Sequence, residues 1–284
     1  MSQRTFAQLQ KEASLELEAC GIDNAKLDCR ILLSHAAGIE YYSLISMAKD
    51  VVPQAVAFKF LELVENRKTG KPVYRIIGKR EFFGRAFEVH EDVLDPRPET
   101  ELLVERILQD FDGRVAKFCE IGIGSGAISV SLLCEQAKLE GLGTDISNTA
   151  IKAASINANN HGVEDRLQIV STDCLKGIEG PFDFVVSNPP YIISKEIDEL
   201  QIEVKNHDPA IALDGGADGL QFYERIFDEA KLVLKEGGLL YLETGHGQHE
   251  DLSVMGAKKG WGLVSKHLDL SGLERIMVFN IGQE

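Results

Sequence analysis

The sequence of 284 residues is short of cysteine, of positive charge and of long apolar runs. Its few cysteines include no CxxC pair, so neither a disulfide framework nor a zinc cluster is expected, and we interpret them as reduced, mostly buried thiols. They are Cys20, Cys29, Cys119, Cys134 and Cys174. The N-terminal region carries Lys11, Glu12 and Glu16 where a signal peptide needs an unbroken apolar stretch, and no run reaches membrane-spanning length. We therefore expect a cytoplasmic protein without a membrane partner.

Acidic residues outnumber basic ones, with 45 Asp and Glu against 30 Lys and Arg, for a formal net charge of -15. This charge disfavours the phosphate contacts on which most nucleic-acid-binding proteins depend. A basic or neutral protein partner is easier to accommodate, and we expect a monomer without a nucleic-acid partner. With 44% hydrophobic residues, the chain can bury the core of one large domain and one smaller domain.

Residues 1–70 have the apolar spacing of helices. Phe6, Leu9, Ala13, Leu17 and Cys20 share one predicted face, and further apolar faces lead up to later glycines. This pattern predicts a small helical bundle, the N-terminal domain. Residues 71–98 contain two strand-like stretches, VYRII and FEVHEDVL, which predict a β-hairpin linker to a larger domain at 99–284.

The region 99–284 opens with a helix, ELLVERILQDF, for which Thr100 or a neighbour is the expected cap. Apolar strands and helical stretches then alternate, as is typical of a doubly wound, Rossmann-like α/β sheet. The predicted strands are AKFCEIG, GLGTDI, LQIVST, FDFVVS and LLYLET. Two final strands, WGLVSKHL and RIMVFNI, are expected to pair as an antiparallel hairpin at the sheet edge.

A glycine-rich turn, Glu120-Ile121-Gly122-Ile123-Gly124-Ser125-Gly126-Ala127, follows the first of these strands. Glycines let the backbone turn sharply and let a ligand approach the N-terminus of the next helix. The turn therefore predicts a nucleotide-binding element. The same spacing also satisfies the dinucleotide-binding fingerprint of dehydrogenases, and a tight turn without a ligand is a further alternative.

Acidic residues end the next two predicted strands. Asp145 follows the glycines at the distance where a carboxylate accepts hydrogen bonds from ribose hydroxyls. Asp173 is placed to accept from an adenine amino group while Cys174 lines the base pocket. Asp173 could equally cap the turn that follows it.

The fourth strand runs into Asn188-Pro189-Pro190-Tyr191, at the carboxyl end of the sheet where open α/β folds bind their ligands. Two consecutive prolines hold the chain rigid, so the carbonyl of Pro189 and the amide oxygen of Asn188 are expected to be fixed acceptors. A rigid turn without catalytic function is the structural alternative.

Two convergent acceptors suit an NH2 group. They would hold both hydrogens of a planar amide-type nitrogen and turn its lone pair toward an electrophilic methyl group. Tyr191 could pack its ring against the planar group. The motif therefore predicts methyl transfer from S-adenosylmethionine, with Asn188, Pro189 and Tyr191 as catalytic residues.

This chemistry needs no metal, and none is expected. His246 and His249 are the only close histidine pair, and no matching ligands accompany them. We interpret both as residues of the loop that follows LLYLET.

Several of these segments resemble the HemK/PrmC family of protein-(glutamine-N5) methyltransferases, which modify the Gln of the Gly-Gly-Gln loop in peptide-chain release factors. The resemblance covers nearly the whole chain. It is carried by PVYRIIGKREFFG, VLDPRPETELLVE, EIGIGSG, SNPPYI and DPAIALDGGADGLQFYERI. The segment PRPETE at 96–101 and the segment DGGADGL at 214–220 are more specific to this family than the reaction-centre motif.

The resemblance implies a cofactor site for S-adenosylmethionine, with S-adenosylhomocysteine as the product. The residues it implies there are Glu120, Gly122, Ile123, Gly124, Ser125, Gly126, Asp145, Asp173, Cys174 and Asn188. Asn188, Pro189, Pro190 and Tyr191 would bind the substrate glutamine amide, and the helical domain would grip the release factor. Glu120 stands where the family more often has Asp, and a longer carboxylate can still reach the methionine amino group. His207-Asp208-Pro209 departs from the usual Glu-Pro start of its segment, which leaves the contacts of that loop open.

Three rival functions are considered. An adenine-N6 methyltransferase acting on RNA or DNA would present the same NH2 group to Asn188 and Pro189, although the net charge counts against it. A nicotinamide-dependent oxidoreductase is compatible with the glycines but leaves Asn188 to Tyr191 unexplained. A scaffold without catalysis predicts no cofactor affinity.

Overall fold

The computed structural model describes residues 4–269 and 271–282. The chain divides into two compact units, Met1–Lys79 with Gln201–His207, and Arg80–Leu200 with Asp208–Glu284. The sequence pattern gave no sign that a short segment near residue 204 belongs with the N-terminal helices.

The first unit consists of helices, as predicted. They are α1 (Phe6–Ala19), α2 (Ala25–Ala37), α3 (Ser43–Ser46), α4 (Gln54–Lys68), α5 (Val73–Ile77) and α9 (Ile202–His207). Thr5 begins α1 with a capping box, in which its hydroxyl accepts from the amide of Gln8 and its own amide donates to the Gln8 side chain. The core contains the predicted apolar face of α1 except Cys20, which ends the helix and is exposed.

Arg67 on α4 connects three helices of this unit. Its Nε donates to Asp28 Oδ2 on α2 at 2.7 Å, and its Nη2 pairs with Glu203 on α9. The guanidinium side chain is only 5% exposed, and a charge so deeply buried needs partners of opposite sign. These contacts account for the return of residues 201–207 to the first unit.

The prediction of a strand at VYRII was wrong, because these residues form helix α5. Pro72 precedes the helix with a fixed backbone, and Gly78 ends it in the left-handed conformation at φ 75°. The β-branched side chains suggested a strand, but these flanking residues favour a single helical turn. The second predicted strand, FEVHEDVL, was also largely wrong, because only its first two residues lie in a strand. The hairpin is formed by β1 (Lys79–Phe82) and β2 (Arg85–Glu88), with Phe83 and Gly84 at positive φ in its turn.

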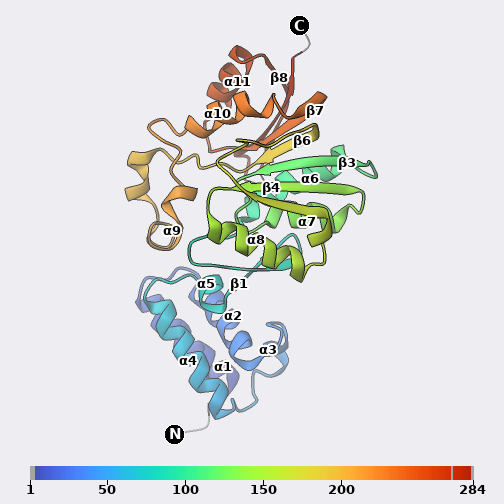
Figure 1. The fold of residues 1–284 in the computed structure, drawn as a ribbon. Coiled ribbons are helices and arrows are strands. Elements are labelled where there is room, and N and C mark those ends of the chain that lie inside the picture. Colours follow the sequence, from blue (N-terminus) through green and yellow to red (C-terminus); the bar gives the residue numbers. More distant parts are fainter. Residues whose placement is uncertain (1–3, 270, 283–284) are drawn as a thin grey trace. The chain divides into compact units, whose positions relative to one another are not determined.

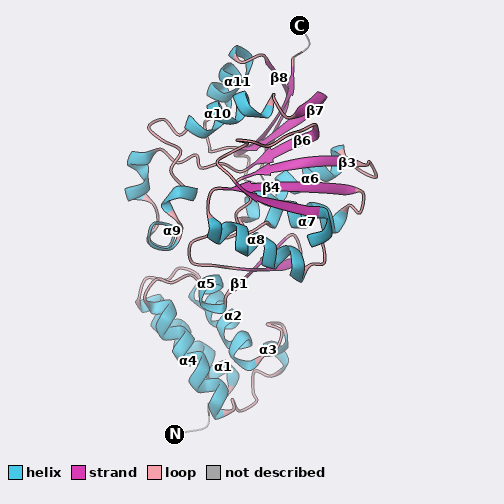
Figure 2. Ribbon diagram, viewed as in Figure 1, coloured by secondary structure: helices cyan, strands magenta, loops and turns pink. Residues whose placement is uncertain are grey.

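The second unit contains a seven-stranded sheet with the order β5-β4-β3-β6-β7-β9-β8 (Figure 2). The strands are β3 (Ala116–Ile121), β4 (Leu139–Asp145), β5 (Leu167–Ser171), β6 (Phe182–Ser187), β7 (Leu234–Glu243), β8 (Trp261–Leu268) and β9 (Glu274–Ile281). The strands from β3 to β7 pair in parallel, whereas β9 pairs antiparallel with both β7 and β8. The doubly wound α/β sheet and its antiparallel edge hairpin are therefore confirmed.

Helices cover both faces of this sheet (Figure 1). On one face lie α6 (Glu101–Asp110), α7 (Ala127–Glu135) and α8 (Asn148–Asn160), and on the other lie α10 (Gln221–Ala230) and α11 (His249–Lys258). Alternate strand residues enter the two cores: Phe118 and Phe184 face α6 to α8, and Cys119 and Val185 face α10 and α11. Helix α11 was not predicted, and His249, which we had interpreted as a loop residue, is its first residue.

Two local expectations need correction. Thr100 occupies the N-cap position of α6, but its side chain makes no capping hydrogen bond. The thiols are all free, yet only Cys29 and Cys119 are buried, while Cys20 is exposed.

Replacing Phe184 by Ala should strongly destabilise the second unit. The ring is fully buried and stacks on Phe118 at a centroid distance of 5.0 Å, with Phe111 at 4.6 Å and Tyr241 at 5.8 Å. Loss of a buried aromatic ring costs about 3–5 kcal/mol. Denaturant unfolding measures this change. The control Leu232→Ala, at a side chain that is 83% exposed, should change the free energy of unfolding by no more than about 0.5 kcal/mol. Equal effects of the two variants would contradict the assigned packing.

Candidate active site

A cavity of about 340 Å³ opens at the carboxyl ends of the parallel strands in the second unit. It lies beside β3 and β6, where the strand order changes direction and open α/β sheets bind ligands. Most predicted site residues line it, namely Glu120, Gly122, Ile123, Gly124, Ser125, Asp145, Asp173, Cys174, Asn188, Pro189 and Pro190. Gly126 and Tyr191 belong to the same loops but lie behind this lining.

The structure adds lining residues that the sequence pattern did not single out. Residues 92–97 border the cavity, together with Thr100 and, from α10, Gln221 and Arg225. The segment PRPETE at 96–101 was noted above only for its resemblance to the family, and nothing in its spacing showed that it lies beside the cofactor strands.

The glycine-rich turn follows β3 with Gly122, Gly124 and Gly126 all at positive φ, which disfavours any other residue. A Cβ at Gly122 would meet nothing within 4 Å, so the turn leaves open space beside the backbone. A Cβ at Gly126 would lie 3.2 Å from Ala154 Cα. Gly126 is therefore required for the approach of α8, whereas Gly122 faces the cavity.

Asp145, at the end of β4, holds the glycine-rich turn in place. Its Oδ2 accepts from the amide of Gly124 at 3.0 Å, and its Oδ1 accepts from the amide of Ser147 at 2.9 Å. These bonds fix the plane of the carboxylate while each oxygen keeps a lone pair for a further donor.

Glu120 is a fully buried acid at the base of the cavity. Its Oε2 accepts from the amide of Ser129 at 3.0 Å and from the hydroxyl of the same residue. Burial raises the pKa of Glu120 to about 8, with Ser129 opposing the rise and Asp145 adding to it. Among the charges acting on Glu120 in the described part of the chain, none is positive. The site therefore favours a cationic group placed beside this carboxyl.

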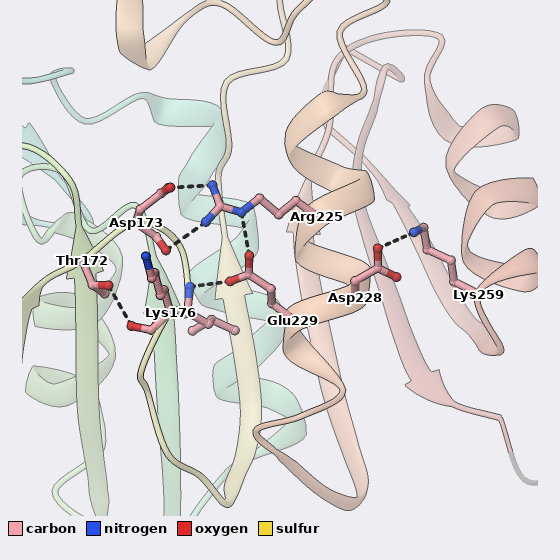
Figure 3. A network of polar contacts seen from close by, with 8 residues as sticks. Thr172, Asp173, Lys176, Arg225, Asp228, Glu229 and Lys259 are labelled. Atoms are coloured by element: carbon pink, nitrogen blue, oxygen red, sulfur yellow. Dashed lines mark hydrogen bonds and ion pairs between the residues drawn. The ribbon is translucent and has the colours of Figure 1, made fainter.

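Asp173, in the loop after β5, is held by α10 (Figure 3). Nη1 of Arg225 donates to Asp173 Oδ1 at 2.6 Å, and Nη2 donates to the main-chain oxygen of Asp173 at 3.0 Å. Nε of Arg225 donates to Glu229, whose second oxygen accepts from the amide of Leu175. These contacts tie the loop of Asp173 and Cys174 to α10, a connection that only the fold reveals.

Asn188 follows β6 directly. Its Nδ2 donates to Thr100 Oγ1 at 3.1 Å, and the hydroxyl of Thr100 donates to Glu243 Oε2 at 2.6 Å. Glu243 is fully buried at the end of β7, and burial raises its pKa to about 7, against the lowering effect of Thr100 and Arg275. Neither Thr100 nor Glu243 was predicted as a site residue.

The segment 214–220 packs against the reaction-centre motif. A Cβ at Gly215 would lie 2.8 Å from Tyr191 Cα and 2.9 Å from Pro190 O. Gln248 donates to the main-chain oxygens of both Tyr191 and Gly219. The Tyr191 ring packs in the core on the α10 and α11 side of the sheet, and burial raises the pKa of its phenol to about 12.

The loop that precedes this segment is anchored at Asp208. Its carboxylate is buried and pairs with Arg97 of the Pro-Arg-Pro turn. The ion pair joins two segments whose contacts the sequence left open.

His246 and His249 do not form a common site. His249 is buried, with Nε2 at 2.8 Å from Thr244 Oγ1 and Nδ1 at 3.3 Å from Glu274, whereas His246 is exposed. Within residues 4–269 and 271–282, no group of three His, Cys, Asp or Glu side chains is arranged to hold a metal ion.

Comparison with known proteins extends this description. The sequence family described as the PrmC N-terminal domain matches residues 8–78, and the family described as the methyltransferase small domain matches residues 91–205. The release factor glutamine methyltransferase of Bradyrhizobium diazoefficiens is 41% identical over 84% of this chain and 82% of its own length. The enzyme of the same name from Agrobacterium fabrum is 36% identical over 94% of each chain.

The chain belongs to the release factor glutamine methyltransferase family. It is a methyltransferase, in agreement with the resemblance noted from its motifs. A solved methyltransferase from Pyrococcus furiosus shares the fold, with a TM-score of 0.54 and 19% identity over 78% of this chain and 98% of that one. In the part of the chain that the structure describes, no helix is long and apolar enough to span a membrane.

Replacing Gly215 by Ala should impair methyl transfer more than stability. The added methyl group would collide with the backbone of Pro190 and Tyr191, and a displacement of about 1 Å at reacting groups can lower turnover about 100-fold. Initial rates and thermal unfolding would be compared with those of Gly162→Ala. That control has φ 67° and open space around its Cβ, so it should lose about 1 kcal/mol of stability and keep its activity. Normal turnover in Gly215→Ala would show that the packed loop does not position the motif.

Proposed function

We propose that the methyl donor is S-adenosylmethionine and that the substrate is the side-chain amide of the Gln in the Gly-Gly-Gln motif of peptide-chain release factors. The observation that carries this proposal is the meeting of the glycine-rich turn, Asp145 and Asn188-Pro189-Pro190 around one cavity. The names of the relatives support the choice of substrate.

The cavity fits the proposed cofactor in its charges and in its open backbone. Gly122 leaves space for a ligand beside the chain, and Asp145 presents a fixed carboxylate suited to a ribose diol. Glu120 offers a buried carboxyl on which no positive charge acts among residues 4–269 and 271–282, and such a group suits the ammonium of the methionine moiety. Asp173 and Cys174 line the part of the cavity that we assign to the adenine. When bound, S-adenosylmethionine supplies a methyl group from a sulfonium centre.

The chain's own residues orient the substrate nitrogen. Asn188 Oδ1 and the carbonyl of Pro189 accept the two N–H groups of the glutamine amide, which turns the nitrogen lone pair into the cavity. These bonds favour a pyramidal nitrogen and so reduce the delocalisation that makes an amide a weak nucleophile. Pro189 and Pro190 hold this geometry because their rings restrict the backbone. Tyr191 supports the loop from its packed position in the core.

Transfer of labelled methyl groups from S-adenosylmethionine to a purified release factor tests the proposal. Label should appear on the intact factor, and it should be absent from the same factor with its loop Gln replaced and from bulk RNA. The Asn188→Ala enzyme should bind S-adenosylmethionine but transfer no label, whereas Asn159→Ala, at an exposed helix position, should remain active. Label on RNA with none on either protein would contradict the proposed substrate and identify the enzyme as a nucleic-acid methyltransferase.

Replacing Glu120 by Gln should have opposite effects on cofactor binding and on stability. A carboxyl whose pKa is about 8 in the folded protein and about 4.5 when unfolded binds its proton more tightly in the folded state. The free energy of unfolding of the ligand-free protein therefore falls between pH 4.5 and pH 8. The Gln variant lacks this loss, so at pH 8.5 it should be more stable than the wild type, yet it should bind S-adenosylmethionine more weakly.

Thermal unfolding at pH 5.5 and pH 8.5, together with calorimetric titration of S-adenosylmethionine, measures both effects. The control Glu236→Gln, at an exposed acid of β7, should change neither. Unaltered cofactor affinity in Glu120→Gln would remove this carboxyl from the cofactor site.

A further inference from the structure

Three polar side chains from distant parts of the sequence form a chain of hydrogen bonds beside the cavity. Thr100 ends the short helix η1 (Pro98–Thr100), Asn188 follows β6, and Glu243 ends β7. Thr100 and Glu243 are 4% and 2% exposed. Asn188 and Thr100 line the cavity, and Glu243 lies behind them.

A carboxylate has no hydrogen to donate, so when Glu243 is ionised the bonds of this chain have only one possible direction. A threonine hydroxyl has one hydrogen, and here it is donated to Glu243 Oε2 at 2.6 Å. The hydroxyl oxygen can then only accept from Asn188, so the amide must turn its NH2 group toward Thr100. Asn188 also lowers the pKa of Glu243, as an NH2 donor beside its carboxylate does. The contact with the Thr100 hydroxyl therefore selects one of the two amide orientations.

We propose that Thr100 and Glu243 are positioning residues that fix the Asn188 amide with Nδ2 turned inward and Oδ1 turned toward the substrate. This inference rests on the proposed function, because the orientation matters only if Asn188 must accept from a substrate NH2 group. The opposite orientation would set the NH2 of Asn188 against the NH2 of the substrate, with two donors facing each other. The two orientations have nearly the same shape, so packing alone discriminates poorly between them.

The Thr100 hydroxyl does not cap the helix that follows it. It stands at the N-cap of α6, where a threonine hydroxyl would ordinarily accept from the helix amides, yet it makes no such bond. A carboxyl as deeply buried as that of Glu243 destabilises the fold unless hydrogen bonds compensate for its loss of water. An apolar side chain would serve better if the position were only structural. The hydroxyl of Tyr223 donates to the main-chain oxygen of Glu243 at 2.9 Å, which holds the end of β7 in place.

The test compares Thr100→Val with Thr100→Ser. Valine keeps the shape of threonine but lacks the hydroxyl, whereas serine keeps the hydroxyl. We expect kcat to fall about 10–100-fold in the valine variant, by analogy with the loss of hydrogen-bond partners of metal ligands, and to recover in the serine variant. The Kd for S-adenosylmethionine should change much less than kcat in both, because the hydroxyl acts on the side of Asn188 that we assign to the substrate. Equal kcat in the valine and serine variants would overturn the inference.

Valine deprives the buried carboxyl of Glu243 of its donor, which destabilises the protein, and the double variant Thr100→Val/Glu243→Leu avoids this cost. It removes both polar groups together, which is commonly neutral for stability. This variant should fold, bind S-adenosylmethionine and still lose kcat. Full activity in the folded double variant would overturn the inference as well.

A measurement without substrate separates this inference from the proposed function. In uniformly 15N-labelled protein, the side-chain NH2 signals of Asn188, assigned by their absence in Asn188→Ala, should show slow hydrogen exchange. This protection should be lost in Thr100→Val and kept in Thr100→Ser. Protection that is the same in both variants would refute the positioning role. Protection that follows the hydroxyl in an enzyme that does not methylate release factors would refute only the proposed substrate.

Discussion

The site depends on one topological constraint, the change of direction in strand order between β3 and β6. Neighbouring strands there send their following loops to opposite faces of the sheet, so the loops diverge and leave a gap above the strand ends. The glycine-rich turn enters this gap from β3 and the Asn-Pro-Pro turn enters it from β6. Asp145, at the end of β4, then joins its strand to the turn after β3 by accepting a hydrogen bond from the amide of Gly124. A cofactor element and a reaction element, separated by more than sixty residues of sequence, thus meet because parallel strands end at a common edge.

Two carboxyl groups are buried at the strand ends of this site, and their burial has an energetic cost. Glu120 and Glu243 are both fully buried, and burial raises the pKa of each carboxyl, so both weaken the ligand-free protein as the pH rises. Their satisfying partners differ in kind. Among the described residues, Glu120 accepts hydrogen bonds from Ser129 and no positive charge acts on it, whereas Glu243 accepts from Thr100 and is influenced by the positive charge of Arg275. We interpret this difference as one between a carboxyl kept for a cationic ligand and a carboxyl that orients a neighbouring side chain.

The sequence predicted the strands and most cavity residues because these follow from local rules. Apolar runs, glycines at strand ends and the rigid Asn-Pro-Pro turn are visible over a few residues. The contacts that tie the site together could not be predicted in this way. Arg225 meets Asp173 across 52 positions, and Thr100 meets Glu243 across 143, so neither pair leaves a periodic signal. Helix α5 was mistaken for a strand because β-branched side chains in a single turn are overruled by the flanking Pro72 and Gly78.

The proposed reaction centre recognises only an NH2 group on a planar carbon, which glutamine shares with adenine. Asn188 and Pro189 therefore define the chemistry without defining the substrate. The discrimination must lie in surfaces that meet the rest of the substrate molecule. A net charge of -15 repels a phosphate backbone whichever way the substrate nitrogen is held, and it does not repel a protein loop of glycines and glutamine. We therefore expect long-range electrostatics and the parts of the chain outside the cavity to discriminate between an amide and a nucleobase.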